Sequence, residues 1–199
     1  MPREASTRRL SRDDWTAEAL RTLGAGGLAS VAIEPIAARL GATKGSGYWH
    51  FRGRADLVAA TLARWEVEHT EAVIAQAETG PGPVDRMREL LRVVLGRSGP
   101  FGVELALLAS SDDPLVAPTV RRVTERRIDY LTSLFRELGF DAALADQRAL
   151  FAYTTYLGHA QLARTVPDAV PRGGPARAAY LESVLATLLG REPDPAPPG

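Results

Sequence analysis

Apolar residues recur at three- and four-residue spacings along most of the chain, and no segment alternates apolar and polar residues as a half-buried strand would. Runs of Gly and Pro, such as Gly80-Pro81-Gly82-Pro83, separate the periodic segments. The pattern predicts an all-α protein of about nine helices. The expected ranges are 11–23, 33–40, 44–51, 54–79, 84–95, 101–110, 118–138, 141–164 and 176–189.

Several residues mark the predicted helix ends. Ser11 and Thr43 are suited to cap the first and third helices, because a side-chain oxygen can accept a hydrogen bond from the first turn. Residues 24–27 (Gly-Ala-Gly-Gly) are expected to end the first helix, and Gly41 to end the second. The segment 54–79 contains neither Gly nor Pro, which predicts one uninterrupted helix.

The composition is that of a globular protein. The 199 residues are 45% apolar and 24% charged, and they suffice for one or two domains with a buried core. There is no Cys and the three His residues are far apart in the sequence, which argues against a thiolate or His-rich metal site. No apolar run approaches the roughly 20 residues of a membrane span. We therefore expect a soluble, cytoplasmic protein with no metal, no cofactor and no membrane contact.

The formal net charge is zero, but the charge is unevenly distributed. Residues 1–60 contain nine Lys or Arg and six Asp or Glu, a balance of +3, whereas residues 61–199 contain 15 and 18, a balance of −3. This difference fits an anion-binding head on an acidic remainder, although imbalances of this size also arise in proteins without that function.

The most specific local pattern lies between residues 33 and 51. Two short helical segments joined by Gly41-Ala42-Thr43 have the spacing of a helix-turn-helix, whose second helix enters the major groove of DNA. Lys44, the only Lys in the chain, begins that second helix. Spacing alone also fits two ordinary helices of a bundle, with Tyr48 and Trp49 in the core.

The residues themselves resemble a known family. The segment 43–51 (Thr-Lys-Gly-Ser-Gly-Tyr-Trp-His-Phe), followed by Arg54, Asp56 and Leu57, is similar to the recognition-helix signature of the tetracycline-repressor-like (TetR) transcriptional regulators. Residues 33–41 resemble the preceding helix of that family. The resemblance implies a three-helix DNA-binding head at 1–53 and a larger helical ligand-binding and dimerisation domain at 54–190. The Pro-rich segment 191–199 is expected to be a disordered tail.

The resemblance also assigns DNA contacts by position. Base reading falls to Lys44, Gly45 and Ser46, and phosphate contact to Thr43, Tyr48, Trp49, His50 and Arg54. Arg8 and Arg9 belong to an N-terminal arm that could add contacts, or they form an ordinary solvated terminus.

Two positions depart from the family pattern. Gly47 stands where members carry a bulky apolar residue, and a Gly inside a helix costs about 1 kcal/mol relative to Ala. Ala32 stands where a Ser or Thr caps the second helix, which forgoes about 1 kcal/mol. If Gly47 leaves space unfilled in the head, Gly47→Leu should stabilise the head by about 1–2 kcal/mol.

Aromatic and polar residues on the remaining helices indicate a ligand pocket. Apolar walls with a few polar anchors are typical of small-molecule sites. The candidate lining residues are Trp65, His69, Glu104, Tyr153, Tyr156 and His159. Each of them also fits a core or interface position.

The last two predicted helices are the candidate dimer interface, because the resembled family dimerises there. Two helices from each protomer would form a four-helix contact. The candidate contact residues are Leu157, Gly158, Leu162, Leu181, Leu185 and Leu188.

These features favour a homodimeric transcriptional regulator, a repressor that releases a palindromic operator when it binds a small molecule. The alternative is a helical small-molecule-binding protein whose head, because of Gly47 and Ala32, binds DNA weakly. A third interpretation is a small helical enzyme that uses His69 or His159. No catalytic constellation supports it, because residues 24–27 follow no strand and lack the spacing of a phosphate loop, so we expect a protein that is not an enzyme.

Overall fold

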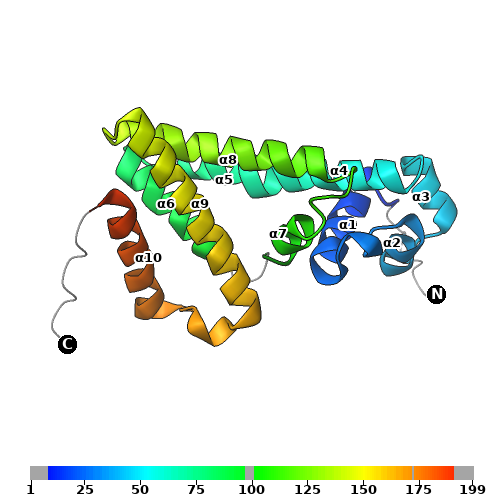
Figure 1. Ribbon diagram of the computed structural model, residues 1–199. Coiled ribbons are helices and arrows are strands. Elements are labelled where there is room, and N and C mark those ends of the chain that lie inside the picture. Colours follow the sequence, from blue (N-terminus) through cyan, green and yellow to red (C-terminus); the bar gives the residue numbers. More distant parts are fainter. Residues whose placement is uncertain (1–8, 97–100, 172, 191–199) are drawn as a thin grey trace.

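In the computed structural model every regular element of the described residues is a helix, as the sequence pattern predicts (Figure 1). The structure describes residues 9–96, 101–171 and 173–190. The predicted tail 191–199 and Arg8 lie outside these described residues. The elements are α1 (Arg12–Gly26), η1 (Leu28–Ser30), α2 (Ile33–Leu40), α3 (Lys44–His50), α4 (Arg54–Glu66), η2 (Val67–Glu71), α5 (Ala72–Ala77), α6 (Pro83–Gly96), α7 (Phe101–Leu108), α8 (Ala117–Glu137), α9 (Ala142–Thr165), η3 (Pro167–Ala169) and α10 (Gly174–Leu189).

The helix number agrees with the prediction when α4, η2 and α5 are counted together. These three elements follow one another directly and form one rod, in which η2 is a π-helical turn. The described ranges then hold nine helices, with η1 and η3 as additional 3-10 turns. Within the same ranges, no helix is both long enough and apolar enough to cross a membrane.

The molecule is elongated, and its two ends differ in construction (Figure 1). Helices α1, α2 and α3 form a small unit at one end, which we call the head; the remaining helices form the body. The rod α4–η2–α5 leaves the head and runs alongside α8, while α6, α9 and α10 pack together at the far end. Helix α7 lies against α1 and thus gives the body a second contact with the head.

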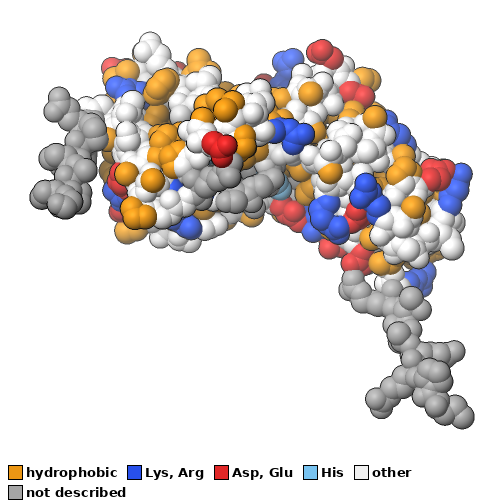
Figure 2. Space-filling model, turned by 90° about the horizontal axis from the view of Figure 1, so that it is seen from below, with side chains coloured by type: hydrophobic (Ala, Val, Ile, Leu, Met, Phe, Trp, Pro, Cys, Tyr) orange, Lys and Arg blue, Asp and Glu red, His pale blue; other side chains and the backbone are white. Residues whose placement is uncertain are grey.

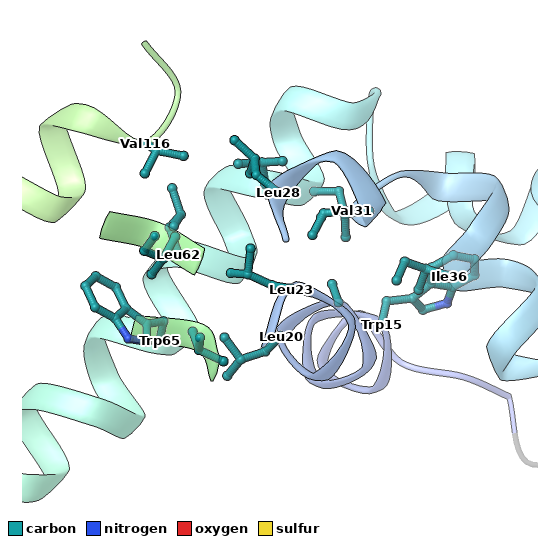
Figure 3. Packing of buried hydrophobic residues seen from close by; sticks show 14 of the residues in the cluster. Trp15, Leu20, Leu23, Leu28, Val31, Ile36, Leu62, Trp65 and Val116 are labelled. Atoms are coloured by element: carbon teal, nitrogen blue, oxygen red, sulfur yellow. The ribbon is translucent and has the colours of Figure 1, made fainter. Parts of the chain in front are cut away.

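The core of the head continues into the body without a break. One cluster of buried apolar residues joins Trp15 and Ile36 of the head to Leu62 and Trp65 of α4 and to Val116 before α8 (Figure 3). The apolar core therefore has no boundary between residues 53 and 54. The assignment of DNA binding to residues 1–53, and of ligand binding and dimerisation to residues 54–190, stays a prediction. Because close-packed interiors transmit displacements, a shift of α4 changes the packing of the head.

A second apolar core fills the far end of the body. It is formed by α5, α6, α8, α9 and α10, and its most completely buried side chains include Met87, Leu134, Phe135, Ala145 and Ala149. Helix α8 takes part in both cores, through Val123 in the first and Leu134 in the second.

The Gly-rich run does not end the first helix where the sequence predicts. Helix α1 continues through Gly24 to Gly26, and Gly27 (φ 73°) caps it. The reason is a close crossing of α1 and α7, because a Cβ on Gly102 would lie 2.5 Å from the carbonyl oxygen of Gly24. Small residues at this crossing let the two backbones touch, so the run packs the head against the body.

Candidate functional site

The turn between α2 and α3 has the geometry that its sequence predicts. Gly41 adopts the left-handed conformation (φ 64°), which L side chains rarely adopt, and this turns the chain sharply after α2. Thr43 then caps α3, since its hydroxyl accepts a hydrogen bond from the backbone N–H of Ser46 at 3.2 Å. Ala32 provides no side-chain cap to α2, as predicted.

One face of α3 is directed to solvent. Thr43, Lys44 and Gly45 are exposed, and the rings of Tyr48 and Trp49 are 46% and 69% exposed. Two large aromatic side chains at such exposure are not core residues, so the alternative that places Tyr48 and Trp49 in the core is wrong. In Figure 2, Lys and Arg side chains are prominent at the end of the molecule that carries the head.

Two basic side chains lie over this face. Lys44 Nζ is 2.5 Å from a carboxylate oxygen of Glu34 on α2, and this hydrogen bond raises the pKa of Lys44, so the side chain is cationic. The guanidinium of Arg9 lies 4.5 Å from the centre of the Trp49 ring. Arg9 thus meets the same face of α3 that the resemblance assigns to DNA.

Two of the predicted phosphate-binding residues have partners inside the protein. His50 Nε2 is 3.0 Å from the carbonyl oxygen of Leu10. Arg54 donates to the carbonyl oxygens of Val31 and Leu28, each at 3.0 Å, and so joins α4 to the segment before α2. These contacts give both residues a role in holding the head together, and their DNA contacts stay a prediction.

Gly47 is buried, and the prediction that Gly47→Leu fills an empty space is wrong. A Cβ at this position would lie 2.6 Å from Ile33 Cγ2 and 2.7 Å from Trp15 Cη2. Gly47 therefore allows α3 to approach Trp15 closely, and any side chain there would push the recognition helix away.

The body contains a mostly apolar cavity of about 70 Å³. It lies between η2, α5, α6, α8 and α9, and its apolar walls include Val73, Leu90, Leu91, Leu131 and Ala152. The predicted pocket residues that line it are His69, Tyr153 and Tyr156. Trp65, Glu104 and His159 are buried beside the cavity but form no part of its wall.

The polar end of this cavity is organised by Arg127, a residue of α8 that the sequence analysis did not identify. Its guanidinium donates hydrogen bonds to a Glu104 carboxylate oxygen at 2.8 Å, to the Thr70 hydroxyl at 3.0 Å and to the His69 carbonyl oxygen at 3.2 Å. Burial lowers the pKa of Arg127, but the charge and hydrogen bond of Glu104, together with Tyr156 and Tyr153, outweigh it, so the pKa is raised and the side chain stays cationic. A charged position within the periodic apolar series Val120, Val123, Tyr130 and Leu134 was the signal in the sequence.

Arg127 also explains the placement of two predicted pocket residues. The guanidinium lies 5.2 Å from the centre of the Trp65 ring and 5.9 Å from that of Tyr156. Trp65 thus supports the cavity through Arg127 and packs in the first core. Glu104 balances the charge of Arg127.

The sequence predicts one uninterrupted helix at 54–79, but in the structure its winding changes at the cavity. Residues Val67–Glu71 form the π-helical turn η2, and the helix proper ends at Ala77. Arg127 binds two groups of this turn, the carbonyl of His69 and the hydroxyl of the buried Thr70. Wide π turns occur often at functional sites, and this one joins the cavity to the helix that enters the head.

His159 lies at the junction of three helices. Its ring stacks on Tyr180 of α10 with the centroids 5.7 Å apart, and it meets the ring of Phe101 of α7 edge-on at 5.6 Å. Burial, and secondarily the charge of Arg177, lowers the pKa of His159. The residue therefore connects α7, α9 and α10 in its neutral form.

The surface of α9 carries a series of exposed apolar residues. Leu144, Phe151, Leu162 and Val166 follow one another on one side of the helix, with Gly158 between them, and the four apolar side chains are 37–50% exposed. Of the predicted dimer contacts, Leu185 and Leu188 are buried within the protomer's own second core. The prediction that these two leucines are available to a partner is therefore wrong.

Comparisons with known proteins agree with this architecture. Residues 16–61 match the family model described as bacterial regulatory proteins, tetR family. Among curated protein sequences none matches the chain. The fold is shared with a proposed transcriptional regulator from Pseudomonas aeruginosa PAO1, at a TM-score of 0.75 and 15% identity over 95% of this chain and 97% of that one.

Two further solved structures have the same fold. One is a tetR-family transcriptional regulator from Agrobacterium tumefaciens, at a TM-score of 0.71 and 23% identity over 90% of this chain and 95% of that one. The other is a proposed regulator from Saccharomonospora viridis in complex with choline, at 0.71 and 17% identity over 90% and 95%. The helix-turn-helix head is thus similar in sequence to the tetR family of bacterial regulatory proteins, and the chain over nearly its whole length shares the fold of these transcriptional regulators.

Proposed function

We propose that this protein is a transcriptional regulator, a homodimeric repressor that binds a palindromic DNA operator through α3 and releases it when a small molecule enters the cavity of the body. The observation that carries the proposal is the rod α4–η2–α5. Its first part packs in the core of the head, and its π turn forms part of the cavity wall. One structural element thus connects a surface suited to DNA with a space suited to a ligand.

The DNA contacts are proposed from the exposed face of α3. Lys44, Gly45 and Ser46 begin the helix, where they would reach base edges in the major groove. Tyr48 and Trp49 present large exposed rings beside them, and Arg9 over Trp49 would add a cation next to the DNA backbone.

The dimer is proposed to form through the exposed apolar series of α9, which comprises Leu144, Phe151, Leu162 and Val166. An apolar side of a long helix that faces solvent in the protomer is typical of an association surface. Gly158 lies within this series and would allow two helices to approach closely. In a symmetric dimer, the two copies of α3 must lie about 34–36 Å apart to reach successive major grooves.

The proposed effector is a small molecule in the cavity lined by His69, Tyr153 and Tyr156. Apolar walls with few polar groups support this, as does the choline complex of the Saccharomonospora viridis regulator, which shares the fold. A weakened head, which was the basis of the alternative function, has less support because Gly47 leaves no unfilled space.

The direct test of DNA binding is selection of bound sequences from a random DNA pool, followed by titration of the selected duplex at several salt concentrations. We expect a palindrome with half-site centres one helical turn apart and an affinity that falls steeply with salt. Recovery of no common sequence, with equal affinity for unrelated duplexes, would contradict the proposal.

A further inference from the structure

We infer that the effector is an electrically neutral, mostly apolar molecule with one hydrogen-bond acceptor that binds Arg127. This inference rests on the proposed function, since it names the chemical class of the molecule that the cavity takes. It depends on three features of the polar end of the cavity: the balance of charge, the donors of Arg127 and the aromatic rings around it.

The charge of Arg127 is already balanced. Arg127 and Glu104 form an ion pair of 2.8 Å in which both side chains are largely buried. An anionic ligand would place a second negative charge beside a single guanidinium, in surroundings where few waters compensate it. The ion pair therefore disfavours carboxylates and other anions.

Two aromatic rings at the polar end of the cavity already have a cation over them. Trp65 and Tyr156 offer ring faces of the kind that hold ammonium groups in proteins, but the guanidinium of Arg127 lies over both, at 5.2 and 5.9 Å. A cationic ligand would place a second positive charge beside the single Glu104 carboxylate, in the same buried surroundings. The same ion pair thus disfavours ligands of either charge.

Arg127 retains donors for a neutral acceptor. A guanidinium carries five N–H groups, and among the described residues three of its hydrogen bonds go to protein acceptors, namely Thr70, Glu104 and the His69 carbonyl. The hydroxyls of two other wall residues are engaged, because Tyr130 donates to Glu78 at 2.6 Å and Tyr153 is 3.3 Å from the Thr124 hydroxyl. A ketone, ester or amide oxygen on an apolar skeleton matches this arrangement.

The experiment compares three probes of similar apolar length on the full chain: nonan-2-one, nonanoate and octyltrimethylammonium. Dissociation constants are measured by isothermal titration calorimetry at one pH and one ionic strength for all three probes. We expect nonan-2-one to bind at least about tenfold more tightly than either charged probe. Equal or tighter binding of a charged probe, or no binding of the ketone, would overturn the inference.

Glu104→Gln sharpens this comparison, because it keeps the shape of the side chain and leaves the charge of Arg127 unbalanced. The ratio of nonanoate to ketone affinity should then rise about tenfold. Glu66→Gln is the matched control, since Glu66 pairs with Arg122 on the surface at 2.6 Å and its loss should leave the ratio unchanged. If the ratio does not change in Glu104→Gln, charge balance does not select the ligand; if that variant fails to fold, the ratio in the unmodified chain decides.

Different results would contradict the proposed regulatory function and the proposed ligand class. A ketone that binds as expected but leaves operator affinity unchanged would contradict the regulatory function and keep the ligand class. A carboxylate that binds best and releases the operator would keep the function and overturn the ligand class.

Discussion

The head and the cavity region of this protein differ in where they place an ion pair: at the surface in the head, and in the interior beside the cavity. In the head the interior around Trp15 is apolar and so tightly packed that Gly47 has no room for a Cβ, while Lys44 and Glu34 pair at the surface. Around the cavity, an ion pair is buried beside space that no side chain fills. A tightly packed interior suits a rigid surface that must fit DNA, and a cavity with a polar end suits a site that exchanges ligands.

The largest effect is expected from breaking the buried ion pair. Arg127→Met keeps much of the side-chain volume but leaves the Glu104 carboxylate buried without a cation, and should lower the free energy of unfolding by about 3–5 kcal/mol. The matched control is Arg122→Met, which removes an exposed partner of Glu66 and should cost less than about 1 kcal/mol. Urea unfolding measures both, and equal losses would show that the cavity pair is not distinct from a surface pair.

The next effect concerns the packing of the head. Gly47→Ala places a Cβ within 2.6–2.9 Å of Ile33 and Trp15 and should destabilise the protein by about 1–3 kcal/mol. Gly45→Ala, two residues earlier in the same helix, meets nothing nearer than 3.9 Å and should instead stabilise it by about 0.5–1 kcal/mol. Opposite signs in thermal unfolding are the expected result, and a stable Gly47→Ala variant would contradict the packing of α3 against Trp15.

A smaller effect is expected in the pH dependence of stability, through His159 in the body. His159 has a lowered pKa because it is buried, so the unfolded chain takes up its proton first as the pH falls below about 6.5. The stability that neutral His159 contributes is therefore present above that pH and lost below it, by at most about 1.4 kcal/mol for each pH unit. His159→Gln should lose less stability than the unmodified chain between pH 7.5 and 5.5 in urea unfolding; an identical loss would show that His159 does not titrate in this range.

The smallest expected change is in the salt dependence of DNA binding. Lys44→Ala removes one cation from α3, and the slope of log affinity against log salt should become shallower by about one unit. Arg92→Ala removes an exposed cation of α6 instead and should leave the slope unchanged. Titrations of the selected duplex distinguish the two, and an unchanged slope and affinity in Lys44→Ala would exclude a DNA contact for this residue.

The head was more predictable from sequence than the cavity, for physical reasons. Caps and turns depend on residues close in the chain, so Ser11, Thr43 and Gly41 could be assigned from local pattern. The crowding at Gly47 depends on a distance to Trp15, 32 positions earlier, and no local pattern carries it. Arg127 could have been found as a charge at an apolar position of α8, but its hydrogen-bond partners come from two other segments, η2 and α7.

The π turn η2 was not predictable from hydrophobic periodicity. Trp65, His69 and Val73 have the four-residue spacing of an ordinary helix, which the sequence analysis extended through this segment. The wider turn is accompanied by hydrogen bonds from Arg127 to the His69 carbonyl and to Thr70, which are tertiary contacts. Here the sequence predicts the rod but not the change in its winding at the cavity.

The function proposed for this protein depends on coupling between the cavity and the head through α4 and η2. Its most direct test is the operator affinity of the full chain with and without saturating nonan-2-one, or the tightest binder found by thermal shift. A coupling free energy of about 1–3 kcal/mol predicts operator binding weakened about 5- to 150-fold, and by linkage the operator must weaken ligand binding by the same factor. An operator affinity that is unchanged when the cavity is saturated would contradict the account.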